Sequence, residues 1–529
     1  MTQPTADGRR DDAIPLRRSK FWRFFSKITD KERHDVAVVS LRQRLSKSLV
    51  ETESGERFIP HGTFEDIIEN DEQSVYQALQ ALRARGSDVP TVFEKVRHSV
   101  PKIFIILVLL GSPDIISLFL KIGIDDSYLP YLPNPSGVED SREKREKWAT
   151  LKEFWSEPDL NNFFGKQWSV LAPRFKRDVD QEFTRYHILP FLPIQKESRT
   201  GGFSLVRKVK IHPKHHEFGK QATGNSAEYV AVKKHYAHDE KIFDAELEAL
   251  RQVQKFQNPH LVQLLTSFKI QEYVGSESGR DCFLVFPWAA GNLRDFWAAN
   301  DNLVRDQRIV PWISEQCCGL ATALALVHEG NISVPEEDRH FGIHADIKPE
   351  NILWFPPPDE VKCQTAGLLA LADFGLYVPL RQRYDTDVSS SSLRVTATYR
   401  PPEFNALGRG GRKMDIWMLG CTYLELVTWF LRGSKATTVD FRESRCEVGE
   451  YGIRSDTFFR MDVDGTWSSA ELKPSVIEWV DQLISMPQCT PYLRDFLILI
   501  TTQMLTVEPR ERITASNLRS ELKKLDSLL

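Results

Sequence analysis

The chain has 529 residues, a formal net charge of −4 at pH 7, 27% charged residues and 41% hydrophobic residues. This composition is typical of a water-soluble globular protein with room for more than one domain, and the small net charge gives no basic surface for a nucleic acid partner. Seven cysteines at irregular spacing do not form a disulfide framework, which favours a reducing compartment, the cytoplasm or alternatively the nucleus.

The first 31 residues are polar and charge-rich, and we expect them to form a disordered arm. Residues 17–27 mix basic and aromatic side chains, so this part could lie on an anionic membrane or could dock its aromatic rings on the neighbouring domain. We favour docking. The longest apolar run, Ile103–Leu110, is far shorter than the roughly 20 residues that span a bilayer, so no transmembrane segment is expected.

Residues 32–185 show the apolar spacing of helices, and we expect a mainly α-helical domain there. The periodic positions include Leu41, Leu45 and Leu49, and then Val75, Leu79 and Leu82. The large aromatic side chains of this segment should be largely buried: Trp155, Phe163, Phe164 and Trp168. No motif in the segment carries recognisable chemistry.

From residue 187 onward the pattern changes to short apolar runs typical of strands. A turn containing Gly201 and Gly202 is followed by the run Val230–Lys233, which ends in a lysine. An amphipathic helix comes next, and Glu246 lies on it 13 residues after the lysine.

The stretch His344–Leu353 reads H-A-D-I-K-P-E-N-I-L and has the chemistry of phosphoryl transfer. That reaction depends on positioning and charge neutralisation more than on covalent participation of the protein. Asp346 can orient an attacking hydroxyl, Lys348 can neutralise γ-phosphoryl oxygens, and Asn351 can bind a metal ion.

Motifs further along the chain support this interpretation. An apolar run leads into Asp373-Phe374-Gly375, which can aim a carboxylate at Mg²⁺, and Pro401-Pro402-Glu403 and Asp415-Ile416-Trp417 follow in order. With these motifs the chain resembles the eukaryotic protein kinase family, serine/threonine type. It is similar in particular to kinase-domain proteins of filamentous fungi that carry a helical N-terminal extension.

The resemblance implies an α+β fold, namely a bilobal protein kinase domain over residues 187–529. An antiparallel, β-rich N-lobe should occupy residues 187–290 and a helical C-lobe residues 291–529, preceded by the helical domain. The implied cofactors are ATP and Mg²⁺, and the implied substrates are proteins. The resemblance further implies that Asn351 and Asp373 are metal ligands, that Glu403 pairs with Arg512, and that Asp415 holds the catalytic loop by its backbone.

An ATP site is implied as well. The family's glycine-rich pattern G-x-G-x-x-G-x-V falls on Arg199–Val206, where Arg199 and Ser204 replace two of the glycines. The residues that the resemblance places around ATP are Gly201, Gly202, Phe203, Val206, Ala231, Lys233, Glu246, Phe286, Pro287, Ala289 and Asp373.

Within this set, Lys233 should bind the α- and β-phosphates and pair with a glutamate. Glu246 and Glu248 compete for that role, and Leu250, at the family's spine position, favours Glu246. Phe286 should be the gatekeeper, and the backbone of Pro287 and Ala289 should meet adenine.

We therefore expect a serine/threonine protein kinase that transfers the γ-phosphoryl group of MgATP to protein hydroxyls. Ala345 stands where the family usually has an arginine that binds a phosphate on the activation segment, here residues 377–394 with candidate phosphosites at Ser389–Ser392. Activity should thus depend less on phosphorylation of that segment. The alternative hypothesis is a pseudokinase scaffold that binds nucleotide or protein partners, and the altered glycine-rich loop is its support.

Overall fold

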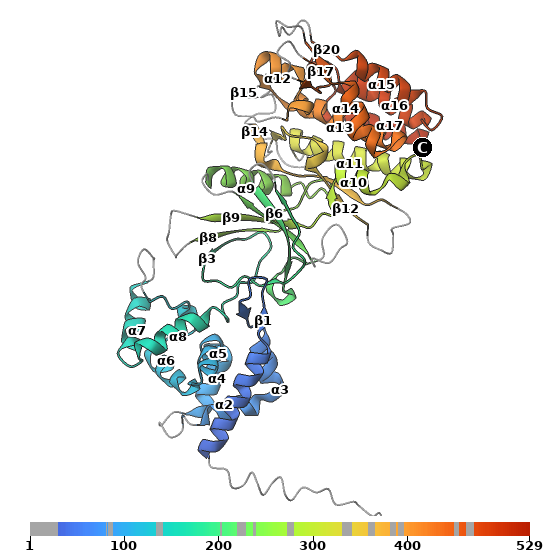
Figure 1. The fold of residues 1–529 in the computed structure, drawn as a ribbon. Coiled ribbons are helices and arrows are strands. Elements are labelled where there is room, and N and C mark those ends of the chain that lie inside the picture. Colours follow the sequence, from blue (N-terminus) through green and yellow to red (C-terminus); the bar gives the residue numbers. More distant parts are fainter. Residues whose placement is uncertain are drawn as a thin grey trace, which may run out of the picture. The chain divides into compact units, whose positions relative to one another are not determined.

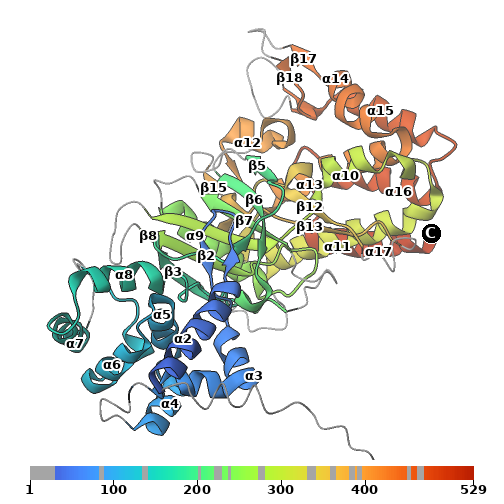
Figure 2. The ribbon, with the colours of Figure 1, turned by 60° about the horizontal axis from the view of Figure 1, so that its bottom comes forward.

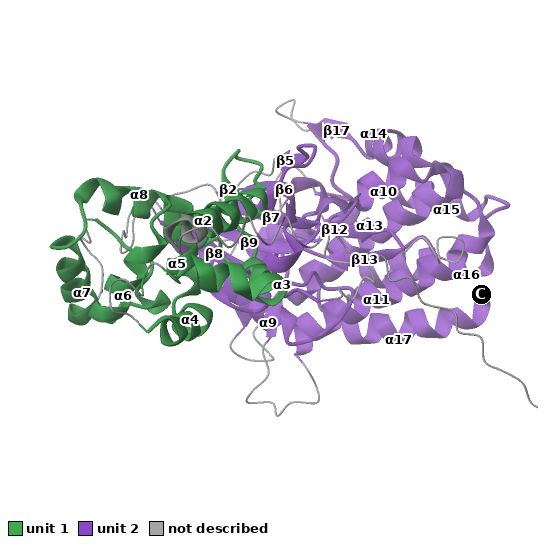
Figure 3. Cartoon of the chain, turned by 90° about the horizontal axis from the view of Figure 1, so that it is seen from below, with its two compact units in different colours: residues 1–174, 186–190 green, residues 175–185, 191–529 purple. Residues whose placement is uncertain are grey.

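The computed structural model describes residues 30–80, 82, 88–133, 141–200, 204–219, 229–235, 240–271, 280–330, 341–357, 365–380, 388–389, 396–448, 454–461 and 470–529. The chain divides into two compact units, which Figure 3 shows in green and purple: residues 1–174 with 186–190, and residues 175–185 with 191–529. The arm expected over residues 1–31 lies outside the described residues except for its last two, which begin the first described helix.

The first unit is mainly α-helical, as the sequence predicted, with one small hairpin (Figure 1). Its helices are α2 (Asp30–Lys47), α3 (Thr63–Ala78), α4 (Val89–His98), α5 (Pro101–Leu110), α6 (Ile116–Ile122), α7 (Arg142–Lys152) and α8 (Glu157–Gln167). In the hairpin, β1 (Val50–Glu51) pairs antiparallel with β2 (Arg57–Phe58).

Helix α5 is the apolar centre of this unit, and its residues from Ile103 to Leu109 are all buried. The helix begins at Pro101, whose fixed φ suits a first turn, and it ends before Gly111, which has a φ of 81°. Around this core the expected burial of Trp155, Phe163 and Trp168 is confirmed. Phe164 is only half-buried, because it lies at the edge of the core.

The second unit begins with a seven-stranded sheet in the order β3-β8-β9-β7-β6-β4, with β5 paired to β6. Its strands are β3 (Asp180–Thr184), β4 (Phe191–Leu192), β5 (Ser198–Thr200), β6 (Ser204–Ile211), β7 (Val230–His235), β8 (Thr266–Gln271) and β9 (Asp281–Pro287). Helix α9 (Glu240–Gln254) lies on one face of this sheet (Figure 2). The expected antiparallel sheet with one helix is present, with one exception in β3.

Strand β3 pairs in parallel with β8, from Asp180 opposite Ser267 to Thr184 opposite Gln271. We had placed residues up to 185 in the helical domain, but residues 175–185 belong to the second unit. The physical reason is this pairing, together with aromatic packing of Phe175 on Phe268 at a centroid distance of 5.4 Å.

The rest of the second unit is a helical lobe with short hairpins. Its helices are α10 (Leu293–Ala299), α11 (Val310–Glu329), α12 (Pro402–Leu407), α13 (Arg412–Arg432), α14 (Phe441–Ser444), α15 (Pro474–Ile484), α16 (Pro491–Leu499) and α17 (Ala515–Leu525). Its strands are β10 (Gly291–Asn292), β11 (Phe341–Ile343), β12 (Ile352–Phe355), β13 (Leu368–Leu371), β14 (Val378–Leu380), β15 (Val388–Ser389), β16 (Arg409–Gly410), β17 (Glu447–Val448), β18 (Arg454–Ser455), β19 (Phe459–Arg460) and β20 (Glu471–Leu472). Strands β10, β12 and β13 form a three-stranded sheet, and the other strands of this lobe pair two by two: β11 with β14, β15 with β16, β17 with β18 and β19 with β20.

Two helices form the centre of this lobe. Helix α13 is buried without interruption from Met414 to Leu431. The segment Gln307–Glu329, which contains α11, is the one helix within the described ranges that is long and apolar enough to cross a membrane. Most of it is buried inside the lobe, which is what a core helix of a globular domain also shows.

Candidate active site

The loop after β11 is held by a carboxylate of the buried helix α13. Asp415 accepts hydrogen bonds from the backbone amides of His344 and Ala345, each at 2.8 Å, and from Nε2 of His328, also at 2.8 Å. Ala345 is fully buried and has a φ of 66°, a backbone conformation that residues other than glycine rarely adopt. Because both carboxylate oxygens bind this turn, the position of the residues that follow is fixed by main-chain contacts.

Asp346 comes next and is surrounded by donors. Its Oδ2 accepts from Nζ of Lys348 at 2.6 Å and from Nδ2 of Asn351 at 2.8 Å. Its Oδ1 accepts from the hydroxyl of Thr396 at 2.9 Å, and that hydroxyl in turn accepts from Lys348 at 2.8 Å. The three residues that the sequence singled out in this loop thus lie together, with an aliphatic hydroxyl bound to the central carboxylate.

Asn351 and Asp373 offer the oxygen atoms that Mg²⁺ prefers. The amide nitrogen of Asn351 donates to both the backbone carbonyl and the carboxylate of Asp346, each at 2.8 Å, which turns the amide oxygen to the other side. Asp373 has a φ of 63° at the end of β13. In the described part of the chain no three His, Cys, Asp or Glu side chains are grouped in a way that could hold a metal ion.

Lys233, Glu246 and Asp373 form an ionic cluster in which the side chains of Lys233 and Glu246 are largely buried and that of Asp373 is about half exposed. Nζ of Lys233 lies 2.6 Å from Glu246 Oε1 and 2.9 Å from Asp373 Oδ1. Burial acts to lower the pKa of Lys233, but the two carboxylates raise it well above its usual value. Burial acts to raise the pKa of Glu246 and of Asp373, but the charge of Lys233 holds each pKa below its usual value. All three groups are therefore charged at neutral pH.

The competing glutamate, Glu248, is exposed, and it accepts a hydrogen bond from Gln252 on its own helix. Helix geometry explains why only one of the two glutamates reaches Lys233. Positions 246 and 248 are two residues apart, so their side chains point in directions that differ by about 200° around the helix axis. Glu246 Oε2 also lies 3.2 Å from Nε2 of His235.

The strands β7 and β9 place the other expected ATP residues side by side. Ala231 pairs with Phe286, and Val230 pairs with Pro287, while Val206 on β6 pairs with Lys233. Phe286 and Ala289 are buried. The remaining three expected residues, Gly201, Gly202 and Phe203, lie outside the described residues.

Arg199, at the first glycine position of the family pattern, binds the segment after β9. It donates to the carbonyl of Ala290 at 2.9 Å, pairs with Asp295 at 3.2 Å, and lies over the ring of Trp288 with its guanidinium carbon 5.6 Å from the centroid. A residue that replaces a glycine here thus links the hairpin to the connection between the two lobes.

Sequence reasoning assigned no role in the site to three residues: His235, His328 and Thr396. The position of His235 could have indicated its role, because residues two apart on a strand share a face, and Lys233 already faces Glu246. His328 could not be recognised in this way, because a single histidine in an apolar helix is common in the core of a protein and does not indicate a role in a site. Thr396 lies ahead of Tyr399 in the sequence, and only the fold brings it to Asp346.

Glu403 and Arg512 form a buried, bidentate ion pair at 2.8 and 3.1 Å. The remaining donors of Arg512 bind the carbonyls of Thr506, Lys413 and Val507. This pair joins the segment after Tyr399 to the C-terminal part of the lobe, as the resemblance implied.

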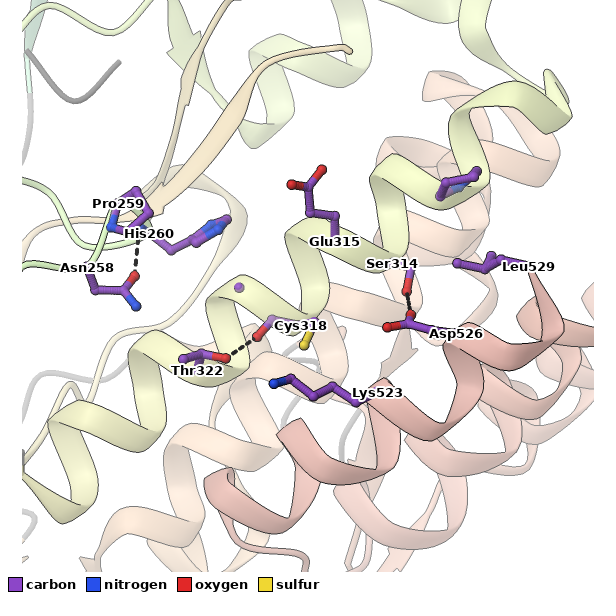
Figure 4. Close-up of a pocket in the computed structure, with 12 residues that line it drawn as sticks. Asn258, Pro259, His260, Ser314, Glu315, Cys318, Thr322, Lys523, Asp526 and Leu529 are labelled. Carbon is purple, nitrogen blue, oxygen red and sulfur yellow. Dashed lines mark hydrogen bonds between the residues drawn. The ribbon is translucent and has the colours of Figure 1, made fainter. Parts of the chain in front are cut away.

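A separate cavity of about 400 Å³ lies between α11, α17 and the loop at residues 258–260 (Figure 4). Ser314 donates to Asp526 across it at 2.5 Å, and Lys523 and Cys318 also line it. None of the residues discussed above for phosphoryl transfer lines this cavity.

The sequence matches the family model of the protein kinase domain over residues 217–521, more than half of the chain. It is similar to the dual specificity protein kinase zak2 of Dictyostelium discoideum, with 39% identity over 93 residues that cover 17% of this chain and 13% of that protein. Cyclin-dependent kinase 4 of Xenopus laevis is 28% identical over 176 residues, covering 33% of this chain and 48% of that protein.

Serine/threonine-protein kinase ppk23 of Schizosaccharomyces pombe is 29% identical over 164 residues, which cover 30% of this chain and 34% of that protein. The chain spans less than half of the length of each of these three relatives. The match to the family model begins after the hairpin that contains Arg199 and Ser204.

Proposed function

The chain belongs to the protein kinase family, and we propose that it transfers the γ-phosphoryl group of MgATP to serine or threonine hydroxyls of protein substrates. One observation carries this proposal most directly. Lys233 lies within hydrogen-bonding distance of both Glu246 and Asp373, so the lysine, the helix α9 and the metal-binding aspartate are assembled together. Phosphoryl transfer in this family requires the ion pair between the lysine and the glutamate, together with an aspartate that is placed to bind Mg²⁺.

Asp346 has the surroundings that a hydroxyl-orienting residue needs. Its Oδ1 already accepts from the aliphatic hydroxyl of Thr396, which supports the proposal that it can accept from a substrate hydroxyl in the same manner. Lys348, 2.6 Å from the other oxygen, keeps a positive charge beside the position where the phosphoryl oxygens gain negative charge. A lysine at this position also favours serine or threonine as the acceptor over tyrosine.

Asn351 and Asp373 would hold Mg²⁺ through their side-chain oxygens, because the amide nitrogen of Asn351 is bound to Asp346 and Asp373 lies 2.9 Å from Lys233. When bound, the ion neutralises charge on the phosphates. The protein contributes to that step by orienting the two ligands. Two hydrogen bonds to Asp346 orient the side chain of Asn351, and the contact with Lys233 orients the carboxylate of Asp373.

The proposal includes reduced dependence on phosphorylation of the activation segment. Ala345 offers no guanidinium to a phosphate, and its methyl group is fully buried. Thr396, two residues after the segment, is instead tied to the catalytic loop by hydrogen bonds to both Asp346 and Lys348. These contacts involve no phosphate group.

A second candidate function is a pseudokinase scaffold that binds nucleotide or protein partners without efficient transfer. The observation in its favour is the altered glycine-rich hairpin, in which Arg199 binds Ala290 and Asp295 where the family has a glycine. The two candidates differ in one measurable property, because a scaffold would bind nucleotide without transferring phosphate.

The test uses the full chain, its Asp373→Asn and Lys233→Met variants, and a basic serine/threonine peptide. Both variants should lower the rate of phosphate transfer by about two orders of magnitude or more, because each removes a charge that is aimed at the phosphates. Asp373→Asn should unfold at a temperature close to the wild-type value, whereas Lys233→Met should unfold at a lower one, because it leaves the Glu246 carboxylate buried without the lysine. Nucleotide binding by wild-type protein without any transfer, with Mg²⁺ or Mn²⁺, would support the scaffold instead.

A further inference from the structure

Residues 175–185 form a short segment, here called the strap, that belongs to the second unit although it is flanked by the first. The chain up to residue 174 and the five residues 186–190 are part of the first unit. The strap also lies ahead of residue 217, where the match to the protein kinase domain begins. Strands β4, β5 and β6 also lie ahead of that residue, but the strap differs from them because both of its ends are continuous with a different compact unit.

The strap is firmly attached to the edge of the sheet. Its strand β3 runs parallel to β8 over five residue pairs. The hydroxyl of Thr266 donates to the carbonyl of Val179 at 2.7 Å, and the amide of Asp178 donates to the carbonyl of Leu265 at 3.0 Å. Phe183 packs on Phe268 with the ring centroids 5.8 Å apart. The strap thus has a fixed register on β8.

Two carboxylates of the strap reach the C-terminal half of α9. Asp180 pairs with Arg251 and also accepts from the hydroxyl of Ser267 on β8. Asp178, which has a φ of 59°, accepts from Nε2 of Gln254 at 2.6 Å. Asp178 and Asp180 therefore connect the edge of the sheet to the helix that carries Glu246.

These polar contacts cross a hollow rather than a packed interface. A cavity of about 580 Å³ lies here, and its lining includes Asp178, Asp180, Arg251 and Gln254. The N-terminal half of α9 is tied down in a comparable way, because Lys269 of β8 lies 2.6 Å from Glu240 and 3.1 Å from Asp244. The helix is thus held to β8 and the strap by ionic contacts near both ends.

Resting on the proposed function, we propose that the strap is a positioning element for the Lys233–Glu246 pair, and that Asp178 and Asp180 are its positioning residues. A helix of this length moves as one body, so contacts at Arg251 and Gln254 influence where Glu246 lies. Release of the strap moves α9 and separates Glu246 from Lys233.

The experiment compares four variants of the full chain with wild type. Asp180→Lys breaks the ion pair between Asp180 and Arg251 by a change in the strap, and Arg251→Gln breaks it by a change in the helix. The double variant, Asp180→Lys with Arg251→Asp, places opposite charges at the two positions again, with their signs exchanged. Glu182→Lys is the matched control, because Glu182 lies on the same strand and accepts from Gln271 of β8 at 2.9 Å without a contact to α9.

The first readout is amide hydrogen exchange of residues 240–254, and the second is kcat and the KM for peptide. Asp180→Lys and Arg251→Gln should each speed exchange in α9 and lower kcat by about twofold to fivefold, as the loss of one exposed ion pair allows. The KM for peptide should not change. The double variant should recover most of the loss, and Glu182→Lys should behave as wild type.

Two results would overturn the inference: unchanged exchange in α9 in both single variants, or an equal effect of Glu182→Lys. The two readouts also separate this inference from the proposed function. If the chain transfers no phosphate at all, the exchange of α9 still reports on the strap. If transfer is normal and exchange in α9 is insensitive to Asp180, only the strap proposal fails.

Discussion

Asp415 binds the backbone amide of Ala345 through one carboxylate oxygen at 2.8 Å, at a position where most protein kinases present an arginine side chain. The other oxygen binds the amide of His344 at the same distance. The catalytic loop is therefore shaped by main-chain hydrogen bonds to a fully buried carboxylate, and it does not depend on a side chain at residue 345.

Asp415→Asn should lower both stability and turnover. An asparagine has one acceptor oxygen and presents an NH₂ group to the second amide, so a buried donor loses its partner, which costs about 1–3 kcal/mol. Urea unfolding of the full chain should show this loss, and the rate of phosphate transfer should fall with it. Asp440→Asn, on an exposed position of the same lobe, is the control and should change neither quantity.

The activation segment should tolerate removal of its candidate phosphosites. Replacing Thr386 and Ser389–Ser392 with alanine should leave most of the turnover on an external peptide, since Ala345 offers no anchor for a phosphate. The measurement is kcat with a saturating peptide. A collapse of activity that acidic substitutions at the same positions restore would show that another basic group binds a phosphate there.

Breaking the buried pair between Glu403 and Arg512 should be among the most destabilising single changes in the helical lobe. Arg512→Met leaves the Glu403 carboxylate buried without its partner, a situation that typically costs about 3–5 kcal/mol. The free energy of unfolding measures this loss, and Arg510→Met, at an exposed neighbouring position, should have little effect. The double variant with Glu403→Gln should lose less than the sum of the two single changes.

In the first unit, Asp126 should make stability depend on pH. Its carboxylate accepts from the amides of Lys102 at 2.8 Å and Ile103 at 3.0 Å, and burial raises its pKa from 3.8 to about 6. Between these two values the folded protein binds more protons than the unfolded chain, so this group makes the free energy of unfolding fall as the pH rises.

The measurement is the difference in thermal stability between wild type and Asp126→Asn as a function of pH. That difference should change across the window from 3.8 to about 6 and be flat above it. Asp35→Asn, an exposed carboxylate on α2, should give no such change. A flat difference for Asp126→Asn would mean that its two amide donors keep the carboxylate ionised.

The sequence predicted the site residues whose spacing within a motif fixes their geometry. Lys233 and Glu246 could be paired from the strand and helix periodicity, and Asp346 with Asn351 from their positions in one loop. His328 could not be assigned, because its partner Asp415 lies on another helix. Only the packing of the two helices brings the side chains together.

The strap was missed for a similar reason. Asp180 pairs with Ser267, far along the chain, and a short strand with a distant partner leaves no periodic signal of its own. Phe175 and Phe183 have the same appearance in a sequence whether they anchor helices or a sheet. The predicted boundary at Arg185 therefore differs from the observed one at residue 174.

The most direct measurement is transfer of labelled γ-phosphate from ATP, with Mg²⁺, to a basic serine/threonine peptide by the purified full chain, beside its Asp346→Asn variant. We predict transfer by the wild-type protein and a loss of about 10²-fold or more in the variant, because asparagine cannot accept the proton of the attacking hydroxyl. Equal transfer by the two proteins, or none by either while ATP still binds, would contradict the assignment of this chain as an active kinase.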